Sequence, residues 1–341
     1  MARLTRVLAR FDDYQRRHRW IGFPVAVLYK FVDDQGVYLT ALIAHYAFIS
    51  LFPLLLVAVT ILGFVLQNDP ALQQRVITTA LDAVPVLGGE VRRQIESFGG
   101  SGIGLVIGLL GTLFGGLGVA QAGQNALNTI WAVPMNMRPN PVTARLRSLG
   151  LLAVFGTGVL ATTVFTLVAG FSHHDLLTTA VVVPVSMATN AALFTVLFHF
   201  GTTHPSTLRD VVPGAVLAGV LVQLLQLFGV YLLASVFSRA SALYGLFGVV
   251  LGLITWITVQ ATVVVFCAEI NVVRTSGLWP RALLTPFTED VELTRADRAA
   301  YTGYAKAQRY IGFEKVEVSF DEPSRADAPA EIPPGREAGR D

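Results

Sequence analysis

Charged side chains are almost entirely excluded from six long apolar stretches of this 341-residue chain. The chain has 25 Lys and Arg residues and 23 Asp and Glu residues, and only one of these, Glu269, lies inside the stretches. A helix needs about 20 residues to cross a hydrocarbon core of about 30 Å, and every stretch is longer than that. The pattern predicts an all-α polytopic membrane protein with six transmembrane helices. The stretches are residues 37–66, 103–130, 149–171, 179–200, 211–237 and 244–272.

The basic residues outside these stretches predict the orientation of the chain in the membrane. With six crossings, both termini lie on the same side. The segments on that side hold 21 Lys and Arg residues, and the loops on the opposite side hold 4. Because Lys and Arg gather on the cytoplasmic side of membrane proteins, we expect both termini to be cytoplasmic (N-in, C-in).

The chain divides into three expected regions. Residues 1–36 form a basic cytoplasmic segment that begins with an interfacial helix. Residues 37–272 form the six-helix membrane domain, which includes an external amphipathic loop over residues 67–102. Residues 273–341 form a cytoplasmic tail. In this tail, Thr294 and Asp297 predict the capped start of a helix over residues 295–310, and the composition predicts disorder from about residue 322.

Proline and glycine residues are expected to shape the membrane helices. As a helix, the first stretch would be about 45 Å long, so it must tilt or bend. Pro53 is the expected kink, since proline removes a backbone hydrogen bond and clashes with the preceding turn. Gly111 and Gly115 lie on one face of the second stretch, where a neighbouring backbone can approach closely.

In the expected topology, the strongly polar side chains of the membrane domain fall mostly in its cytoplasmic half. Ionisable groups inside a membrane are costly and usually face the bundle interior or a wet cavity. The functional interpretation is therefore a polar vestibule open to the cytoplasm. A structural alternative stays open: Glu269 lies near a helix end and could snorkel or pair with Arg209, Arg147 or Arg274, and His45 could simply donate a hydrogen bond to a carbonyl. The vestibule candidates are Arg209, Asp210, Glu269, Asn271, His45 and Asn125.

A second group of polar side chains, all amides, is expected nearer the middle of the membrane. These side chains fit a polar layer that closes the vestibule. They also fit hydrogen bonds between neighbouring helices, which is the more common role of such groups. The four amides are Asn190, Gln223, Gln226 and Gln260.

Motifs for catalysis, cofactors and nucleic acids are missing from the sequence. His173, His174 and Asp175 have no further ligand nearby, so we expect no metal site. The chain has neither a phosphate-binding glycine loop nor a nucleophile elbow, and no basic domain outside the membrane suits nucleic acid. We therefore expect a protein that is not an enzyme and that uses no cofactor.

Three motifs resemble the YihY/BrkB family of bacterial inner-membrane proteins. Residues 41–56 (ALIAHYAFISLFPLLL) are similar to the first-helix signature of the family. Residues 210–215 (DVVPGA) resemble its Asp-x-x-Pro-Gly-Ala motif at the start of the fifth helix. Residues 244–248 (YGLFG) and 268–271 (AEIN) resemble its closing helix. The likeness spans about residues 40–275 and therefore the whole membrane domain.

The resemblance implies a multi-pass protein of the bacterial inner membrane that is associated with envelope integrity. Relatives have been linked to the export of lipid or lipopolysaccharide. The family also carried the name of a tRNA-processing ribonuclease. No hydrolytic metal cluster or basic RNA groove in this sequence supports that activity.

Two hypotheses about function follow, and they belong to different classes. In the first, the protein transports or flips a lipid or other amphiphile: Arg209 attracts an anionic headgroup, Asp210 orients that arginine, and Glu269 titrates or gates. In the second, it is a non-transporting scaffold for envelope machinery, with partner contacts on the external loop or the tail. The expected partners are membrane lipids, with envelope proteins or a second copy of the chain as further candidates. A membrane enzyme that acts on lipid through Asp210 and Glu269 is the weakest alternative.

Overall fold

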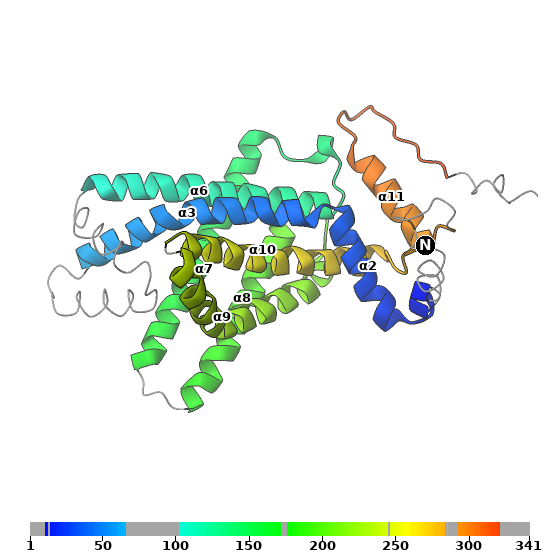
Figure 1. Ribbon diagram of the computed structural model, residues 1–341. Helices are drawn as coiled ribbons and strands as arrows, with labels where there is room; N and C mark the ends of the chain where they lie inside the picture. Colours follow the sequence, from blue (N-terminus) through cyan, green and yellow to red (C-terminus); the bar gives the residue numbers. More distant parts are fainter. Residues whose placement is uncertain are drawn as a thin grey trace, which may run out of the picture.

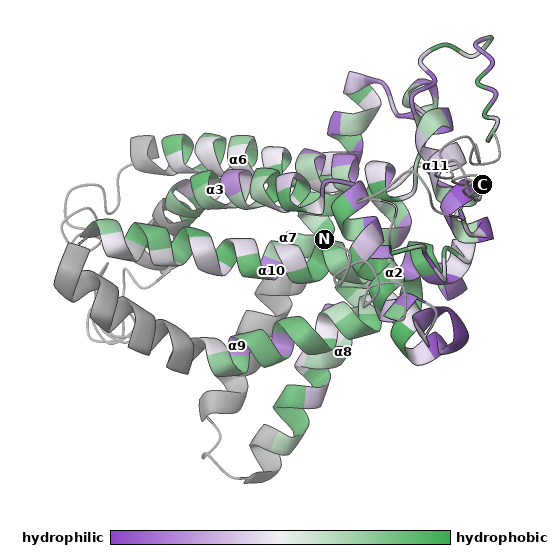
Figure 2. Cartoon of the chain, turned by 45° about the vertical axis from the view of Figure 1, so that its right-hand side comes forward, coloured by the Kyte–Doolittle hydropathy of each residue, from purple (hydrophilic) through white to green (hydrophobic). Residues whose placement is uncertain are grey.

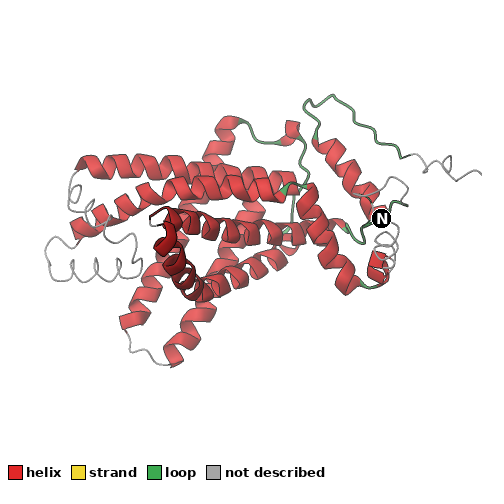
Figure 3. Ribbon diagram, in the orientation of Figure 1, coloured by secondary structure: helices red, strands yellow, loops and turns green. Residues whose placement is uncertain are grey.

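A computed structural model of the chain describes residues 11–12, 14–65, 102–171, 176–244, 246–283, 285 and 292–320. Most of these residues are helical, and none of them lies in a strand (Figure 3). Six long helices account for most of the described chain, and each contains all or nearly all of one predicted apolar stretch. They are α3 (Gly36–Val65), α6 (Gly102–Ile130), α7 (Pro141–Phe171), α8 (Leu176–Phe200), α9 (Leu208–Tyr244) and α10 (Leu246–Ser276).

Five of these helices are long and apolar enough to cross a membrane, judged over the described residues. The third predicted crossing lies in α7, which is not one of the five. The all-helical membrane fold is therefore confirmed, while six crossings with both termini in the cytoplasm stay a prediction. The five spans are Gly36–Leu54, Val106–Ile130, Ala180–Phe200, Leu208–Gly229 and Val250–Ser276.

The six long helices form a closed ring. Each helix packs against the next one along the chain, from α3 through α6, α7, α8 and α9 to α10, and α10 then packs against α3. Figure 1 shows the first of these contacts, with α3 and α6 side by side. The contact between the first and last helices therefore closes the ring. Because every helix has a neighbour on each side, the side chains that face inward surround a common interior.

The glycine-rich face of α6 brings this helix close to α3. A Cβ atom at Gly115 would lie 2.5 Å from Cβ of Ser50, and one at Gly111 would lie 2.8 Å from Cβ of Pro53. These positions confirm the close packing predicted for the glycine pair. Pro53 lies inside α3, and the missing side chain at Gly111 leaves room for its ring.

A smaller polar layer covers one end of the ring, which we call the charged end. It contains α2 (Arg19–Asp33), the segment 277–283 and α11 (Arg295–Ala307). Figure 2 shows hydrophilic residues gathered in this layer, beside long helices that are mostly hydrophobic. The capping box predicted at Thr294 is confirmed, since Thr294 and Asp297 bond to each other's backbone N–H groups at the start of α11. In the expected topology, the charged end faces the cytoplasm.

Three sequence-based predictions lie outside the described residues. These are the start of the interfacial helix in residues 1–10, the external amphipathic loop over 67–102 and the disordered tail from about residue 322.

Candidate functional site

A cavity of about 440 Å³ lies inside the ring. All six long helices contribute to its walls, including Ile43 of α3, Leu152 of α7 and Val222 of α9. Proteins bind small ligands in pockets of about 300–1,000 Å³, so the volume suits a ligand. The cavity is therefore the candidate functional site of the described chain.

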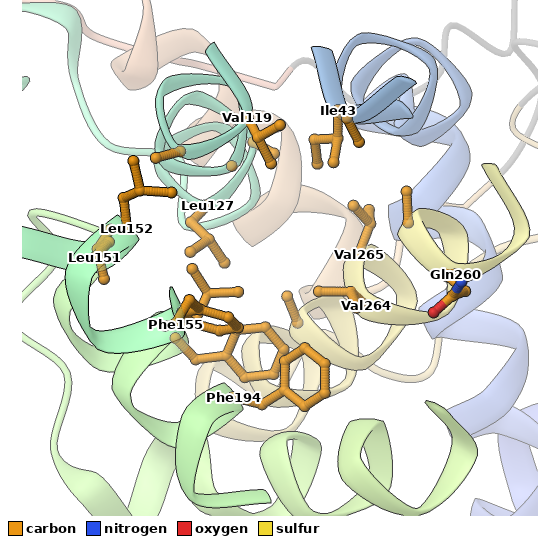
Figure 4. A pocket seen from close by; sticks show the side chains of 18 of the residues that line it. Ile43, Val119, Leu127, Leu151, Leu152, Phe155, Phe194, Gln260, Val264 and Val265 are labelled. Carbon is orange, nitrogen blue, oxygen red and sulfur yellow. The ribbon is translucent and has the colours of Figure 1, made fainter. Parts of the chain in front are cut away.

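The walls of this cavity are apolar. Phe155, Phe194 and Leu127 gather on one side of it, and Val264 and Val265 face them from α10 (Figure 4). Among the described residues that line it, only Ser50 and Gln260 have polar side chains. An apolar cavity of this kind suits hydrocarbon and gives little stabilisation to a charged group.

No hydrogen bond between described residues joins two of the six predicted vestibule residues, and the shared polar vestibule stays a prediction. His45, Asn125 and Arg209 are exposed, whereas Glu269 and Asn271 are buried. None of the six lines the cavity. Asn125, Asp210 and Asn271 hydrogen-bond to different groups. Asn125, for example, accepts a hydrogen bond of 3.0 Å from Arg138.

Asp210 and Arg209 lie at the start of α9, where their roles in the structure are local. Asp210 accepts hydrogen bonds from the backbone N–H and the hydroxyl of Thr207, at 2.8 and 2.7 Å, and so caps the helix. Pro213 has no N–H group, so the carbonyl of Arg209 lacks its helical donor. The side chain of Arg274 takes this place and donates to that carbonyl at 3.1 Å.

Asn271 connects α10 to α9. Its side-chain oxygen accepts a hydrogen bond of 2.7 Å from the N–H of Gly214, and its amide nitrogen donates to the carbonyl of Val211 at 3.0 Å. A Cβ atom at Gly214 would overlap the carbonyl oxygen of Cys267, so only glycine lets the two helices come this close. The motifs at 210–215 and 268–271, which are far apart in sequence, therefore form one helix contact.

The four mid-membrane amides do not form a continuous layer. Asn190 of α8 donates a hydrogen bond of 3.2 Å to Gln223 of α9, so this pair follows the interhelical alternative. Gln226 is exposed, and Gln260 lies at the margin of the cavity (Figure 4).

Glu269 belongs to a buried group of charges that we call the charge cluster, made up of Lys30, Asp34 and Glu269. The ammonium of Lys30 donates to Asp34 one helical turn further along, and to the carbonyl of Ile130 at 2.9 Å. It lies 3.6 Å from Oε2 of Glu269. The side chains of Lys30 and Asp34 are 2% exposed, and that of Glu269 is 0% exposed. The partner of Glu269 is therefore Lys30 of α2 and not one of the three arginines considered from the sequence.

The charge cluster lies directly against one end of the cavity. Ile130, whose carbonyl binds Lys30, also lines the cavity. Ala268 and Val265 of α10 also line the cavity. Glu269 is the residue after Ala268 and lies one helical turn after Val265. The buried charges therefore form part of the layer that separates the cavity from the charged end.

A second ionic network joins the polar layer together. Arg281 is fully buried, and it binds Asp297 of α11 at 2.6 Å and Asp33 of α2 at 2.8 Å. Tyr304 of α11 donates to Asp33 at 3.4 Å, and its ring centroid lies 5.4 Å from the ammonium of Lys30. Burial raises the pKa of the Tyr304 phenol, so this side chain stays neutral. The network ties α2 and α11 to each other above the charge cluster.

Lys30 was not among the functional residues predicted from the sequence, although the sequence carries two signals for it. Lys30 lies four residues after Ala26 and three after Val27, on the apolar face of α2, where a lysine must be buried or snorkel. Glu269, the only charged residue in the six apolar stretches, also requires a cation nearby. What the sequence lacks is any sign that α2 folds back against α10.

The described residues offer no group of three or more His, Cys, Asp and Glu side chains that could hold a metal ion. The described residues that line the cavity carry no charged side chain. The chemistry that this arrangement supports is the binding of an apolar group beside a buried ionic cluster.

The fold and the cavity together define a multi-pass α-helical membrane protein with an apolar interior cavity. The family described as "Virulence factor BrkB" matches residues 27–281, which include α3 and most of the charge-bearing contacts described above. The chain belongs to this family, as the resemblance in the sequence predicted. No curated protein and no solved structure matches the chain.

Proposed function

We propose that this protein moves a lipid or a similar amphiphile within the bacterial inner membrane, and that the central cavity holds the apolar tail of the transported molecule. The observation that carries this proposal is a cavity of about 440 Å³ with apolar walls, lined by residues of all six long helices. Hydrocarbon gains about 0.8 kcal/mol for each methylene removed from water, but it gains little on passing from lipid into protein. A cavity in a membrane protein therefore binds a lipid tail weakly, so that the tail can enter and leave it over a small free-energy barrier.

The cavity replaces the polar vestibule in this proposal. An anionic headgroup is not expected to enter the cavity, since its walls offer no cation. Arg209 remains exposed at the start of α9, where it can attract headgroups at the membrane surface. The protein acts by binding and movement, and the proposal involves no catalytic residue.

Gly123 provides a sharp test because it lines the cavity and faces open space. A Cβ atom at Gly123 would have no neighbour within 4 Å. Leucine at this position would occupy part of the cavity without a clash, and it also favours the helix over glycine by somewhat less than 1 kcal/mol. Gly150 of α7 is the matched control: it has the same free space but is exposed and does not line the cavity.

The experiment measures the movement of a fluorescent phospholipid headgroup between leaflets of proteoliposomes made of phosphatidylethanolamine and phosphatidylglycerol. We expect the parent protein to accelerate movement over protein-free vesicles. Gly123→Leu should slow it, since the leucine side chain occupies part of the space that the lipid tail would fill. Gly150→Leu should match the parent. Equal rates for Gly123→Leu and the parent would exclude the cavity, and a parent rate equal to that of empty vesicles would exclude the transport of this lipid.

The scaffold remains the second proposal, and the same measurement separates it from the first. A scaffold has no need of an open cavity, so it predicts no headgroup movement and full activity of Gly123→Leu in supporting envelope integrity in cells.

A further inference from the structure

The charge cluster has an unequal number of positive and negative groups. It holds one ammonium, Lys30, and two carboxylates, Asp34 and Glu269, and all three side chains are at most 2% exposed. With every group ionised, the cluster carries a net charge of −1. An excess charge that is shielded from water is strongly unfavourable, and buried groups avoid it by exchanging a proton.

Among the described residues, Lys30 is the one cation that pairs with Asp34 or Glu269. Arg281 is held by Asp33 and Asp297 in the network of the polar layer. Tyr304 of α11 covers Lys30 with a neutral ring, and α6 contributes only the backbone carbonyl of Ile130. The charged and titratable groups near the cluster are therefore Lys30, Asp33 and Asp34 of α2, Glu269 of α10, Arg281 of the segment 277–283, and Asp297 and Tyr304 of α11.

Glu269 is the member whose bonding is incomplete. Lys30 donates to Asp34 and Ile130, and its distance of 3.6 Å from Glu269 is too long for a hydrogen bond. Neither carboxylate oxygen of Glu269 accepts a hydrogen bond from the described residues. A fully buried carboxylate whose two oxygens accept no hydrogen bond costs far more than a neutral carboxylic acid in the same place.

We propose that the charge cluster is a proton-binding site that holds one proton on its two carboxylates, and that this proton is the ion coupled to lipid movement. Binding forms one O–H bond on a carboxylate and leaves the cluster neutral, with Lys30 facing one carboxylate and one carboxylic acid. Release breaks that O–H bond, passes the proton to water at the charged end and leaves a net charge of −1. The coupling half of this inference rests on the proposed function, but the proton site does not.

The position of the cluster explains how a proton would act on the cavity. Release leaves two carboxylates competing for a single ammonium, which weakens the contact between α2 and α10 beside Ile130 and Ala268 of the cavity wall. Burial also raises the pKa of the Asp34 carboxyl, and the charge of Lys30 offsets only part of that rise. The carboxyl pair is therefore suited to hold a proton where free carboxyl groups have lost theirs.

The proton site is tested by infrared spectroscopy of the full chain in lipid nanodiscs at pH 7, using the C=O band of a protonated carboxyl group. We expect one such band in the parent. Glu269→Gln and Asp34→Asn should each abolish it, since the remaining carboxylate then balances Lys30. Lys30→Met should increase it about twofold, because two carboxyl groups without a cation both take up protons. Glu317→Gln is the control, since Glu317 pairs with Lys315 in water and is 77% exposed.

If the ion cluster were merely structural, the C=O band would not disappear in Glu269→Gln and Asp34→Asn and increase in Lys30→Met. No carboxyl band in the parent, or an unchanged band in both Glu269→Gln and Asp34→Asn, would overturn the proton site. If one of these two variants fails to fold, the other carries the same test, because charge balance predicts the same loss for both.

Coupling is tested with the same variants in proteoliposomes that carry a pH gradient. We expect the parent to move lipid at rates that change when the gradient is reversed, and Glu269→Gln to move lipid at one rate in both directions of the gradient. A parent rate that ignores the gradient would overturn the coupling. The two proposals fail separately: a carboxyl band without lipid movement rejects the proposed function alone, and lipid movement without the band rejects the proton site alone.

Discussion

The side chain of Asn271 shows how one amide can join two long helices in an apolar setting. It satisfies one backbone donor and one backbone acceptor in the first turns of α9, next to the point where Pro213 interrupts the helical hydrogen bonds. Arg274, one turn further along α10, binds the carbonyl that Pro213 leaves free. The two side chains therefore complete the start of α9 from outside that helix.

Replacing Asn271 with alanine should lower the free energy of unfolding by about 1–3 kcal/mol, because two buried bonds to backbone groups are lost together. Unfolding by a graded increase of denaturing detergent, followed by circular dichroism, measures this change. Asn125→Ala is the control, since Asn125 is exposed and its hydrogen bond to Arg138 lies at the surface. Equal losses in the two variants would show that the contact between α9 and α10 is not held by Asn271.

At the scale of elements, α11 is attached to the rest of the protein mainly through Asp297. This carboxylate caps its own helix through Thr294, and it binds the buried Arg281 and the backbone N–H of Ala282. The helix itself has few apolar side chains to bury, and Ala296 and Ala300 are its buried apolar residues. Its position therefore depends on charge and hydrogen bonding more than on hydrophobic packing.

Asp297→Ala should release α11 while leaving the ring intact. Removing one partner of a buried ion pair costs about 3–5 kcal/mol, and losing the helix cap adds about 1 kcal/mol. We expect backbone amides of α11 to exchange with solvent at least about a hundredfold faster than in the parent, as measured by hydrogen exchange and mass spectrometry. Glu317→Ala, which breaks an exposed pair, should leave the exchange of α11 unchanged. Equal protection of α11 in Asp297→Ala and the parent would contradict this attachment.

Local features of the elements could be read from the sequence because they depend on neighbouring residues. Exclusion of charge located the six long helices, and the Thr294–Asp297 spacing located the start of α11 to the residue. The extension of α7 back to Pro141 was not predicted, because residues 141–148 include Arg145 and Arg147 and so end the apolar stretch. Asn140 caps this extension by binding the N–H of Thr143 at 2.8 Å.

At the scale of the whole molecule, the polar layer and the ring form one folded unit. Residues 292–320 therefore cannot be treated as a free tail, although they follow the last long helix. Asp297 forms an ion pair with Arg281, and the ring of Tyr304 lies against the ammonium of Lys30. The backbone carbonyl of Arg309 accepts a hydrogen bond of 3.0 Å from the N–H of Asn136.

Truncation separates the folded and the remaining parts of this C-terminal region. A chain that ends at residue 320 should match the parent in both unfolding and lipid movement, since it keeps every contact described for α11. A chain that ends at residue 289 should unfold at a lower concentration of denaturing detergent, because Arg281 loses Asp297 while buried. Loss of lipid movement in the chain that ends at residue 320 would place an essential role in residues 321–341. Retained lipid movement in that chain, combined with lost envelope function in cells, would favour the scaffold.

The pairs that fix the architecture of the whole molecule could not be predicted from the sequence. Lys30 and Glu269 lie near opposite ends of the described chain, and no local spacing relates them. The surroundings of the vestibule candidates could not be predicted for a similar reason: depth in the membrane was inferred along each helix, but the direction in which each side chain faces depends on the ring. His45 and Glu269 occupy related depths in the expected topology, and one is exposed while the other is fully buried.

The contact between α3 and α10 also sets an order of assembly. Ribosomes deliver the N-terminal part of a chain first, so Lys30 is synthesised long before Glu269. Until α10 is inserted, the face of α3 that packs against α10 is uncovered. At this stage the ammonium of Lys30 has only Asp34 of the cluster as its carboxylate partner. Translation of α10 covers this face of α3 and supplies Glu269, the second carboxylate. The insertion of α10 therefore closes the ring and completes the wall of the cavity in one step.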